Sequence, residues 1–329
     1  MKERLSQWDH LPDKEIDAIL FLDGSSKAKI NHVLDNIKAD EWDTVSKANL
    51  KRCEHLASLG RYSDAIQSLG SNGIHLVDQN ILDQLQEKHP NYEKKLKMDF
   101  NSCPSIKLDE VFVKKSIKSF CKGSAGGPDG MRVEFLKKWS KGPTGELFLK
   151  TLVRFLDLII QGKFCKKFAE YFSGATLIPL RKPDGGVRPI AVGNVMRRLA
   201  CKCALKSVGD QVPSKLLPNQ FGVCIQGGAE SIIHSVNSVL QSLKNSEDYA
   251  VLQIDFKNAF NMVDRQHMFD VVAENFPELA KLVDFTYNCQ GLLVCQDTNV
   301  LSCAGVQQGD PLGPLLFSLV LNKLILMIN

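Results

Sequence analysis

The chain has 329 residues, of which 44% are apolar and 24% charged, so it is not an intrinsically disordered protein and has enough apolar residues for a buried core. Residues 2–4 are charged and no apolar run of signal-peptide type follows, so we expect a nuclear or cytoplasmic protein that is not secreted. No stretch has the ~18 consecutive apolar residues of a membrane span, and the 10 cysteines form no C-x-x-C pair, which argues against a membrane anchor, a zinc site or a disulfide framework.

The charges are distributed unevenly along the chain. Residues 114–207 contain 20 Lys and Arg against 6 Asp and Glu, whereas residues 208–329 contain 6 against 12. A segment this basic suits a polyanion, because each phosphate contact releases condensed counterions. A solvated basic surface is an equal alternative. The acidic last third can supply carboxylates for metal ions.

The first hundred residues predict short helices. Apolar residues across 27–59 follow nearly helical spacing, which Gly60 and the turn residues 71–73 interrupt. A further helix is predicted over 77–85. Because no catalytic pattern occurs here, we interpret residues 1–105 as a helical connector or docking region.

Residues 106–247 predict helices joined by turns and one hairpin. The expected helices cover residues 108–120, 133–139, 147–160, 195–208 and 230–243. A glycine-rich block (residues 124–130, SAGGPDG) forms a tight turn whose amides can approach a ligand closely. Strands are expected over 175–180 and 187–192, joined by the turn Pro-Asp-Gly-Gly.

The last part of the chain mixes strands and helices. We predict a buried strand over 249–256, a helical stretch after it, and a short hairpin within 289–303. A glycine-rich turn over 305–314 leads into a helix over 315–328 that is apolar on nearly all sides. Such a helix belongs in a protein core.

The first segment that indicates chemistry is the first motif, residues 253–261 (QIDFKNAFN). An acid at the end of an apolar strand can face solvent and a cation. The Asp255 carboxylate and the Phe256 carbonyl are the oxygen ligands that Mg²⁺ prefers, and Phe260 would pack beside whatever occupies the site. The alternative, which this segment alone slightly favours, is that Asp255 caps the following helix.

The second motif comprises residues 305–317 (GVQQGDPLGPLLF). Glycines at 305, 309 and 313 permit close backbone approach to a base pair or sugar, and Gln308 offers both a donor and an acceptor. Taken alone, a helix N-terminus with turn residues is the safer interpretation.

The third segment is the basic hairpin, residues 177–190. Arg181 and Lys182 lie on one strand and Arg188 on the other, which brings three cations near one another. Such a group is a plausible clamp for a triphosphate. The alternative is an exposed basic hairpin without a ligand.

Together and in this order, these segments resemble a reverse transcriptase of the non-long-terminal-repeat retrotransposon type. The match begins at the glycine-rich block and includes residues 217–228 (LPNQFGVCIQGG), which resemble the family's block between hairpin and palm. The resemblance implies an α+β right-hand polymerase, with fingers over 106–247 and an incomplete palm over 248–329. It also implies RNA-directed DNA synthesis from deoxynucleoside triphosphates on an RNA template with a DNA primer.

The resemblance also implies roles for the first motif. Asp255 would be a ligand of both catalytic Mg²⁺ ions, for which Mn²⁺ can substitute, and the Phe256 carbonyl would join one of them. One ion would lower the pKa of the primer 3′-hydroxyl and the other would neutralise the leaving pyrophosphate. Phe260 stands at the steric-gate position, where an aromatic ring collides with a ribose 2′-hydroxyl.

The resemblance assigns the remaining site residues to the incoming nucleotide. Lys182 and Arg188 would contact its triphosphate, and Gln308 and Gly309 would line the nucleotide and template side.

One departure from the family pattern is important. Members of the family have an acidic pair, aromatic-x-Asp-Asp, soon after the second motif, but this chain has no Asp-Asp pair. Because one carboxylate cannot hold two Mg²⁺ ions at catalytic spacing, we expect a reverse transcriptase fragment, truncated before that motif, that does not polymerise on its own. The apolar helix over 315–328 would then be exposed and favour self-association.

Two rival functions remain. A non-catalytic remnant of a retroelement could bind RNA through residues 114–207. An RNA-templated RNA polymerase is disfavoured by Phe260, because a small residue at that position would admit a ribose.

Overall fold

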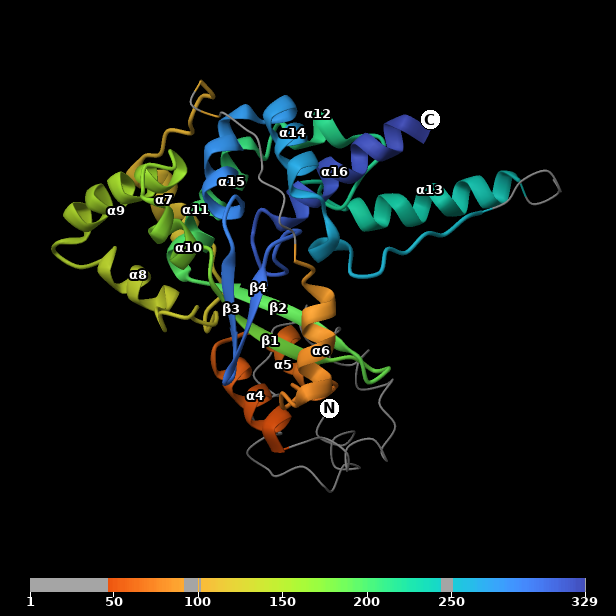
Figure 1. The fold of residues 1–329 in the computed structure, drawn as a ribbon, viewed down its shortest axis with the longest axis horizontal. Helices are drawn as coiled ribbons and strands as arrows, with labels where there is room; N and C mark the ends of the chain where they lie inside the picture. Colours follow the sequence, from red (N-terminus) through yellow and green to blue (C-terminus); the bar gives the residue numbers. More distant parts are fainter. Residues whose placement is uncertain (1–46, 92–99, 101, 244–250, 329) are drawn as a thin grey trace. The chain divides into compact units, whose positions relative to one another are not determined.

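A computed structural model describes residues 47–91, 100, 102–243 and 251–328 (Figure 1). The chain divides into two compact units. The small unit comprises Met1–Ile74, Cys121–Ser124 and Leu180–Gly186, and the large unit comprises His75–Phe120, Ala125–Pro179 and Val187–Asn329. The three-part division into connector, fingers and palm stays a prediction.

The small unit contains two packed helices, α4 (Lys47–Ser58) and α5 (Tyr62–Leu69). Gly60 separates them with φ +74°, a conformation that favours glycine. The Asn49 side chain closes the pair by donating to the carbonyl oxygens of Leu69 (3.3 Å) and Ser71 (2.7 Å). The break at Gly60 was predicted, α5 was not, and residues 27–46 of the expected first helix lie outside the described residues.

The helices of the large unit are α6 (Gln79–Lys88), α7 (Glu110–Lys118), α8 (Val133–Trp139), α9 (Gly145–Ile160), α10 (Lys166–Phe172), α11 (Val195–Val208), α12 (Val212–Leu216), α13 (Gly228–Ser242), α14 (Arg265–Asn275), α15 (Ala280–Tyr287) and α16 (Gly313–Ile328). Two 3₁₀ turns, η2 (Ala259–Met262) and η3 (Pro277–Leu279), precede α14 and α15. The predicted helix over 195–208 is confirmed residue for residue. Helices α10, α12 and α15 were not predicted.

Capping side chains set several helix boundaries. Asp78 accepts from the Ile81 amide (2.8 Å) and begins α6 two residues later than its apolar pattern suggests. In the same way Asp109 accepts from the Phe112 amide (2.7 Å) and begins α7. A carboxylate at the N-cap satisfies an amide that has no partner inside the helix.

A four-stranded mixed sheet runs in the order β2-β1-β3-β4, with β1 (Ala175–Arg181), β2 (Val187–Gly193), β3 (Gly291–Cys295) and β4 (Thr298–Ser302). Strand β1 pairs in parallel with β3, with Ala175 opposite Leu293, and β3 pairs antiparallel with β4. Both predicted hairpins are thereby confirmed, and the chain is α+β.

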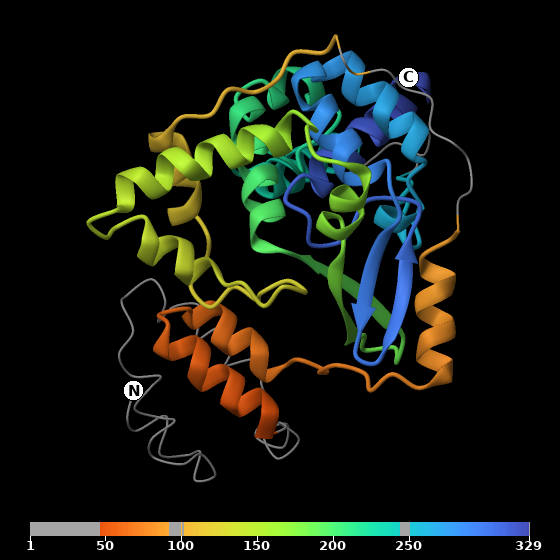
Figure 2. The same ribbon diagram turned by 60° about the vertical axis from the view of Figure 1, so that its left-hand side comes forward.

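Helix α6 covers one face of this sheet (Figure 2). Alternate strand residues point into the interface, as expected of a sheet with one buried face. The buried members of this cluster are Ile81, Leu85, Ala175, Leu177, Val187, Ala191, Leu293, Cys295 and Val300.

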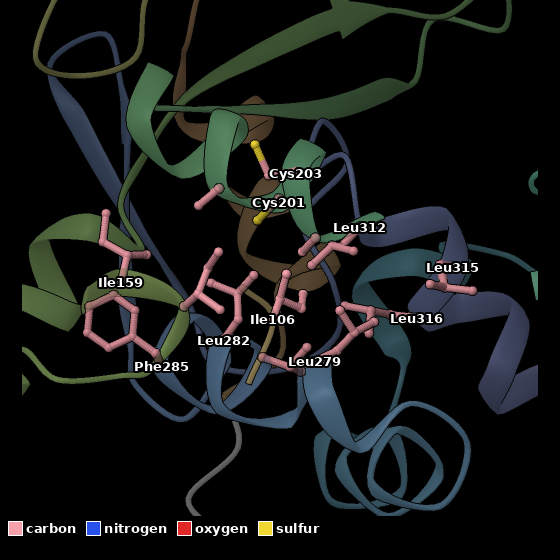
Figure 3. Close-up of a cluster of buried hydrophobic side chains, with 14 of the residues drawn as sticks. Ile106, Ile159, Cys201, Cys203, Leu279, Leu282, Phe285, Leu312, Leu315 and Leu316 are labelled. Atoms are coloured by element: carbon pink, nitrogen blue, oxygen red, sulfur yellow. The ribbon is translucent and has the colours of Figure 1, made fainter. Parts of the chain in front are cut away.

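A second apolar core lies among the helices. Figure 3 shows Ile159 of α9, Cys201 and Cys203 of α11, Leu282 and Phe285 of α15, and Leu315 and Leu316 of α16 converging on one cluster. The helix over 315–328 therefore joins a core with its first half, as predicted. Its last turns do not, because Leu324, Leu326, Met327 and Ile328 are exposed.

The predicted buried strand over 249–256 is wrong for the residues that can be compared. Residues 251–256 have no regular secondary structure, and the side chains of Val251, Leu252 and Ile254 are 74%, 81% and 65% exposed. A strand needs a neighbour that accepts its backbone hydrogen bonds. None of the four strands in the described part of the chain pairs with this segment, so an apolar pattern alone does not make it a strand.

No helix in the described part of the chain has the length and apolar character needed to cross a membrane.

A buried histidine at the end of α6 predicts a pH dependence of stability. Burial lowers the pKa of His89, while a contact of 2.7 Å between its Nδ1 and the Leu85 carbonyl oxygen partly opposes that shift. Below the ordinary pKa of 6.5 the unfolded chain binds a proton that the folded chain does not, so stability falls with falling pH.

We therefore expect the urea midpoint of the wild type to fall between about pH 7.5 and about pH 5.5, and to fall less in His89→Gln. Over this pH range the free energy of unfolding should fall by about 1 kcal/mol more in the wild type than in His89→Gln. Equal losses in both would mean that His89 takes up its proton without unfolding.

Candidate active site

The first and second motifs lie side by side in the large unit. The Phe260 carbonyl oxygen accepts from the Val306 amide (2.8 Å), and the Gly305 amide donates to the Val263 carbonyl oxygen (2.9 Å). Gly305 has φ +64°, and a Cβ there would collide with the Asn261 backbone. Only glycine at position 305 therefore permits the first and second motifs to approach this closely. The family resemblance had assigned both motifs to one site.

The Phe260 ring packs against the second motif. It is half-buried and stacks on Phe317 of α16, with 5.1 Å between ring centroids and 13° between ring planes. A Cβ at Gly313 would lie 3.5 Å from the same ring. The residue predicted to be a steric gate is thus held against the N-terminal end of α16.

Asp255 lies on the exposed segment that precedes η2. It makes no hydrogen bond or ion pair with the residues that the structure describes. The alternative that Asp255 caps the next helix is wrong, because Asn258, with φ +56°, occupies the position before η2. Nothing in the described part of the chain therefore occupies the Asp255 carboxylate.

A divalent metal site needs more than the described residues offer. No group of three or more His, Cys, Asp or Glu in the described ranges could hold an ion. Asp255 and the Phe256 carbonyl by themselves do not fit two divalent ions, which require several carboxylate oxygens. Asp310 does not complete the set, because its carboxylate forms a buried ion pair. Asp297 belongs to no group of possible metal ligands among the described residues.

Gln308 and Gly309 lie against strand β2. The Ala191 amide donates to the Gln308 carbonyl oxygen (2.8 Å). Gly309 has φ +125°, and a Cβ there would collide with the Ala191 carbonyl oxygen. Arg188 is exposed on the same strand, so the structure joins the strand that carries this cation to the second motif.

Lys182 stands in the turn of the basic hairpin, within the small unit. Its amide donates to the Gly186 carbonyl oxygen (2.8 Å), and its carbonyl oxygen accepts from the Gly185 amide (3.1 Å). These bonds confirm the predicted hairpin turn. Because Arg188 belongs to the large unit, a clamp formed by both cations stays a prediction.

A buried ion pair that sequence reasoning missed fixes the second motif. Arg197 of α11 donates through Nη2 to Asp310 Oδ2 (2.9 Å), and through Nη1 to Gln307 Oε1 (2.7 Å) and the Ser173 carbonyl oxygen (2.8 Å). The two charged side chains are 2% and 1% exposed. Burial alone would lower the pKa of Arg197, but Asp310 and Tyr287 outweigh it and the pKa lies above its ordinary value.

The Asp310 carboxylate has further donors. The Tyr287 hydroxyl donates to Oδ2 (2.7 Å) and the Leu312 amide donates to Oδ1 (2.9 Å). Burial and the neighbouring carboxylate raise the pKa of Tyr287 well above its ordinary value, so the phenol stays protonated as a donor. A buried charge is tolerated when its oxygens are satisfied in this way.

A second buried arginine also binds the backbone near the second motif. Among the described residues Arg265 of α14 has no carboxylate partner, and its acceptors there are neutral oxygens. The acceptors are the carbonyl oxygens of Gly305, Tyr287, Cys289, Ser302 and Ala304 and the Ser302 hydroxyl. Burial lowers its pKa to about 10. Arg265 thus ties α14 to the backbone that leads into the second motif.

The glycine-rich block supports the start of α11. A Cβ at Gly127 would collide with the backbone of Asn194, the N-cap of α11, and Arg198 donates to the Ala125 carbonyl oxygen. The close approach that these glycines allow is thus to another part of the chain.

Known proteins resemble the region that contains both motifs. Residues 180–329 match the sequence family described as "Reverse transcriptase (RNA-dependent DNA polymerase)". This part of the chain is therefore similar to reverse transcriptases. The family acts with divalent metal ions on nucleic-acid templates and nucleotides.

A curated relative extends the likeness toward the N-terminus. The chain is 28% identical over 222 residues to the Retrotransposable element SLACS 132 kDa protein of Trypanosoma brucei gambiense. The match covers 65% of this chain and 18% of that protein, so the chain spans less than a fifth of the relative's length. The predicted resemblance to a retrotransposon reverse transcriptase is confirmed.

The buried ion pair yields a prediction about stability. Arg197→Met leaves the Asp310 carboxylate buried without its counter-charge, and we expect the free energy of unfolding to fall by about 3–5 kcal/mol. Urea denaturation followed by circular dichroism measures this loss.

Lys150→Met is the matched control. It breaks the exposed α9 pair with Glu146 (3.0 Å) and should leave the urea midpoint unchanged. An Arg197→Met protein with the wild-type midpoint would show that the Arg197–Asp310 pair adds nothing to stability.

Proposed function

We propose that this chain supplies the nucleotide-binding and template-binding part of a retrotransposon reverse transcriptase, with fingers over 106–247 and palm residues over 248–329. The observation that carries the proposal is the packing of Phe260 into the second motif, beside the strand that bears Arg188. The gate residue and the polar backbone edge then belong to adjoining segments, and the strand bonded to them carries a cation for the phosphates of an incoming nucleotide.

In this proposal Asp255 and the Phe256 carbonyl provide part of a Mg²⁺ site, which Mn²⁺ can also occupy. Carboxylates outside the described residues complete the set. The exposure of Asp255 and its lack of partners within the described part of the chain support this role. Because Asp255 is the carboxylate that the described residues offer to this site, we expect no primer extension by this chain alone.

The cations and polar groups of the site would act on the rest of the nucleotide. Arg188 offers a planar fork of donors to phosphate oxygens, and Lys182 offers a compact charge. Gln308 and Gly309 present polar and backbone groups toward the base and template. Phe260 occupies the space that a ribose 2′-hydroxyl would need.

Replacement of the acid tests the metal role. In the complete protein that contains this chain, Asp255→Ala should abolish primer extension and leave RNA binding unchanged, because it removes a ligand of the ions and no phosphate contact. Asp297→Ala, which removes another exposed carboxylate, serves as the control and should retain extension. Primer extension that persists in Asp255→Ala would refute the proposed metal ligand.

Replacement of the gate tests the sugar discrimination. Phe260→Ala opens the space beside the sugar, and we expect the ratio of ribonucleotide to deoxyribonucleotide incorporation to rise about 10- to 100-fold. Single-nucleotide extension on an RNA template measures the ratio. A ratio equal to that of the wild type would remove Phe260 from the gate.

A second candidate function is RNA binding without catalysis. The observation that favours it is a series of exposed basic side chains on the large unit: Lys115, Lys118, Lys138, Lys141, Lys163, Lys166 and Lys167. Exposed cations can follow a phosphate backbone, whatever chemistry the rest of the chain performs.

This surface predicts salt-dependent RNA binding by the chain itself. Replacing Lys163, Lys166 and Lys167 with Gln should make the slope of log K against log salt shallower by about 2, since each lost phosphate contact contributes about 0.7 on a single strand. Lys215→Gln/Lys281→Gln, outside the basic segment, is the control. Wild-type binding that does not respond to salt would refute a phosphate-binding surface.

A further inference from the structure

The Phe260 ring depends on its neighbours for its orientation. Its backbone is fixed by the hydrogen bond from Val306, but that bond leaves the side-chain torsions free. The ring itself stacks on Phe317, and the absence of a side chain at Gly313 leaves room for its edge. Gly313 and Phe317 are four residues apart on α16 and therefore share one face of the helix.

Beyond Phe317 the structure is open. A groove of about 370 Å³ lies between the segment around η2 and α16, and Phe317 lines it together with Phe256, Met262, His267, Leu324 and Met327. Without the Phe317 ring, the side chain of Phe260 would have free volume into which to turn. A steric gate excludes a hydroxyl only while its ring cannot move aside.

We propose that Phe317 is a positioning residue for sugar selection: its ring holds Phe260 in the orientation that excludes a ribose 2′-hydroxyl. The inference rests on the proposed function of Phe260 and adds a residue that touches neither substrate nor metal. It predicts that discrimination depends on the shape of side chain 317, whereas a loss of folding would reduce the use of both sugars alike.

The first test measures the ribonucleotide to deoxyribonucleotide ratio in the complete protein. Phe317→Leu should raise the ratio about 2- to 10-fold, in proportion to the energy of one aromatic pair. Phe317→Tyr keeps the stacked ring and should retain the wild-type ratio. Leu324→Ala, an exposed position two turns further along α16, is the control for general loosening of the helix. In the Phe260→Ala background, Phe317→Leu should add nothing.

The second test needs no catalysis. A 4-fluorophenylalanine placed at position 260 of this chain reports the stacked ring through its ¹⁹F chemical shift. Phe317→Leu should move this resonance and Phe317→Tyr should not. An unmoved resonance in Phe317→Leu would overturn the proposed contact.

The outcomes separate the two proposals. If Phe260→Ala changes the sugar ratio but Phe317→Leu does not, the gate stands and the positioning role of Phe317 is refuted. If neither variant changes the ratio, the gate assignment fails and the positioning role fails with it, whatever the ¹⁹F shift shows.

Discussion

A buried ion pair holds the second motif of the large unit in place. Arg197 and Asp310 are 113 positions apart in the sequence, yet their side chains meet at 2.9 Å where almost no water reaches them. Arg197 also binds Gln307, so the two residues that flank Gln308 and Gly309 are bonded to one guanidinium. Burying these charges is costly unless every oxygen is satisfied, and the donors from Tyr287 and Leu312 meet that condition.

Local signals in the sequence predict much of the fold. The hairpin around residues 183–186 follows from its turn residues, and the whole of α11 follows from its apolar spacing. Helices α10 and α15 were not predicted; they are 7 and 8 residues long and lack a capping side chain, whereas α8, equally short and uncapped, was predicted from its apolar spacing. The segment 251–256 has the apolar character of a strand, but strand formation depends on a partner that no local pattern specifies.

The candidate site divides along the same line. The family resemblance assigns Phe260 and the second motif to the same nucleotide site. Gly305 is the sequence feature that allows the two segments to touch. The cluster of Arg197, Asp310 and Tyr287 could not be predicted, because its members lie on separate elements and each has an ordinary local context. Arg197 is one of four basic residues in α11, and Asp310 lies in a turn before an apolar helix, so neither residue indicates its partner in the sequence.

The conformation at Gly309 limits how this surface can change. Its φ of +125° and the nearby Ala191 carbonyl oxygen both exclude a side chain, so the surface there consists of peptide atoms alone. An inhibitor that hydrogen-bonded to those atoms would contact groups that no amino-acid replacement can take away. Resistant variants would have to alter a neighbouring side chain, and Gln308 is the nearest one that can vary without straining the backbone.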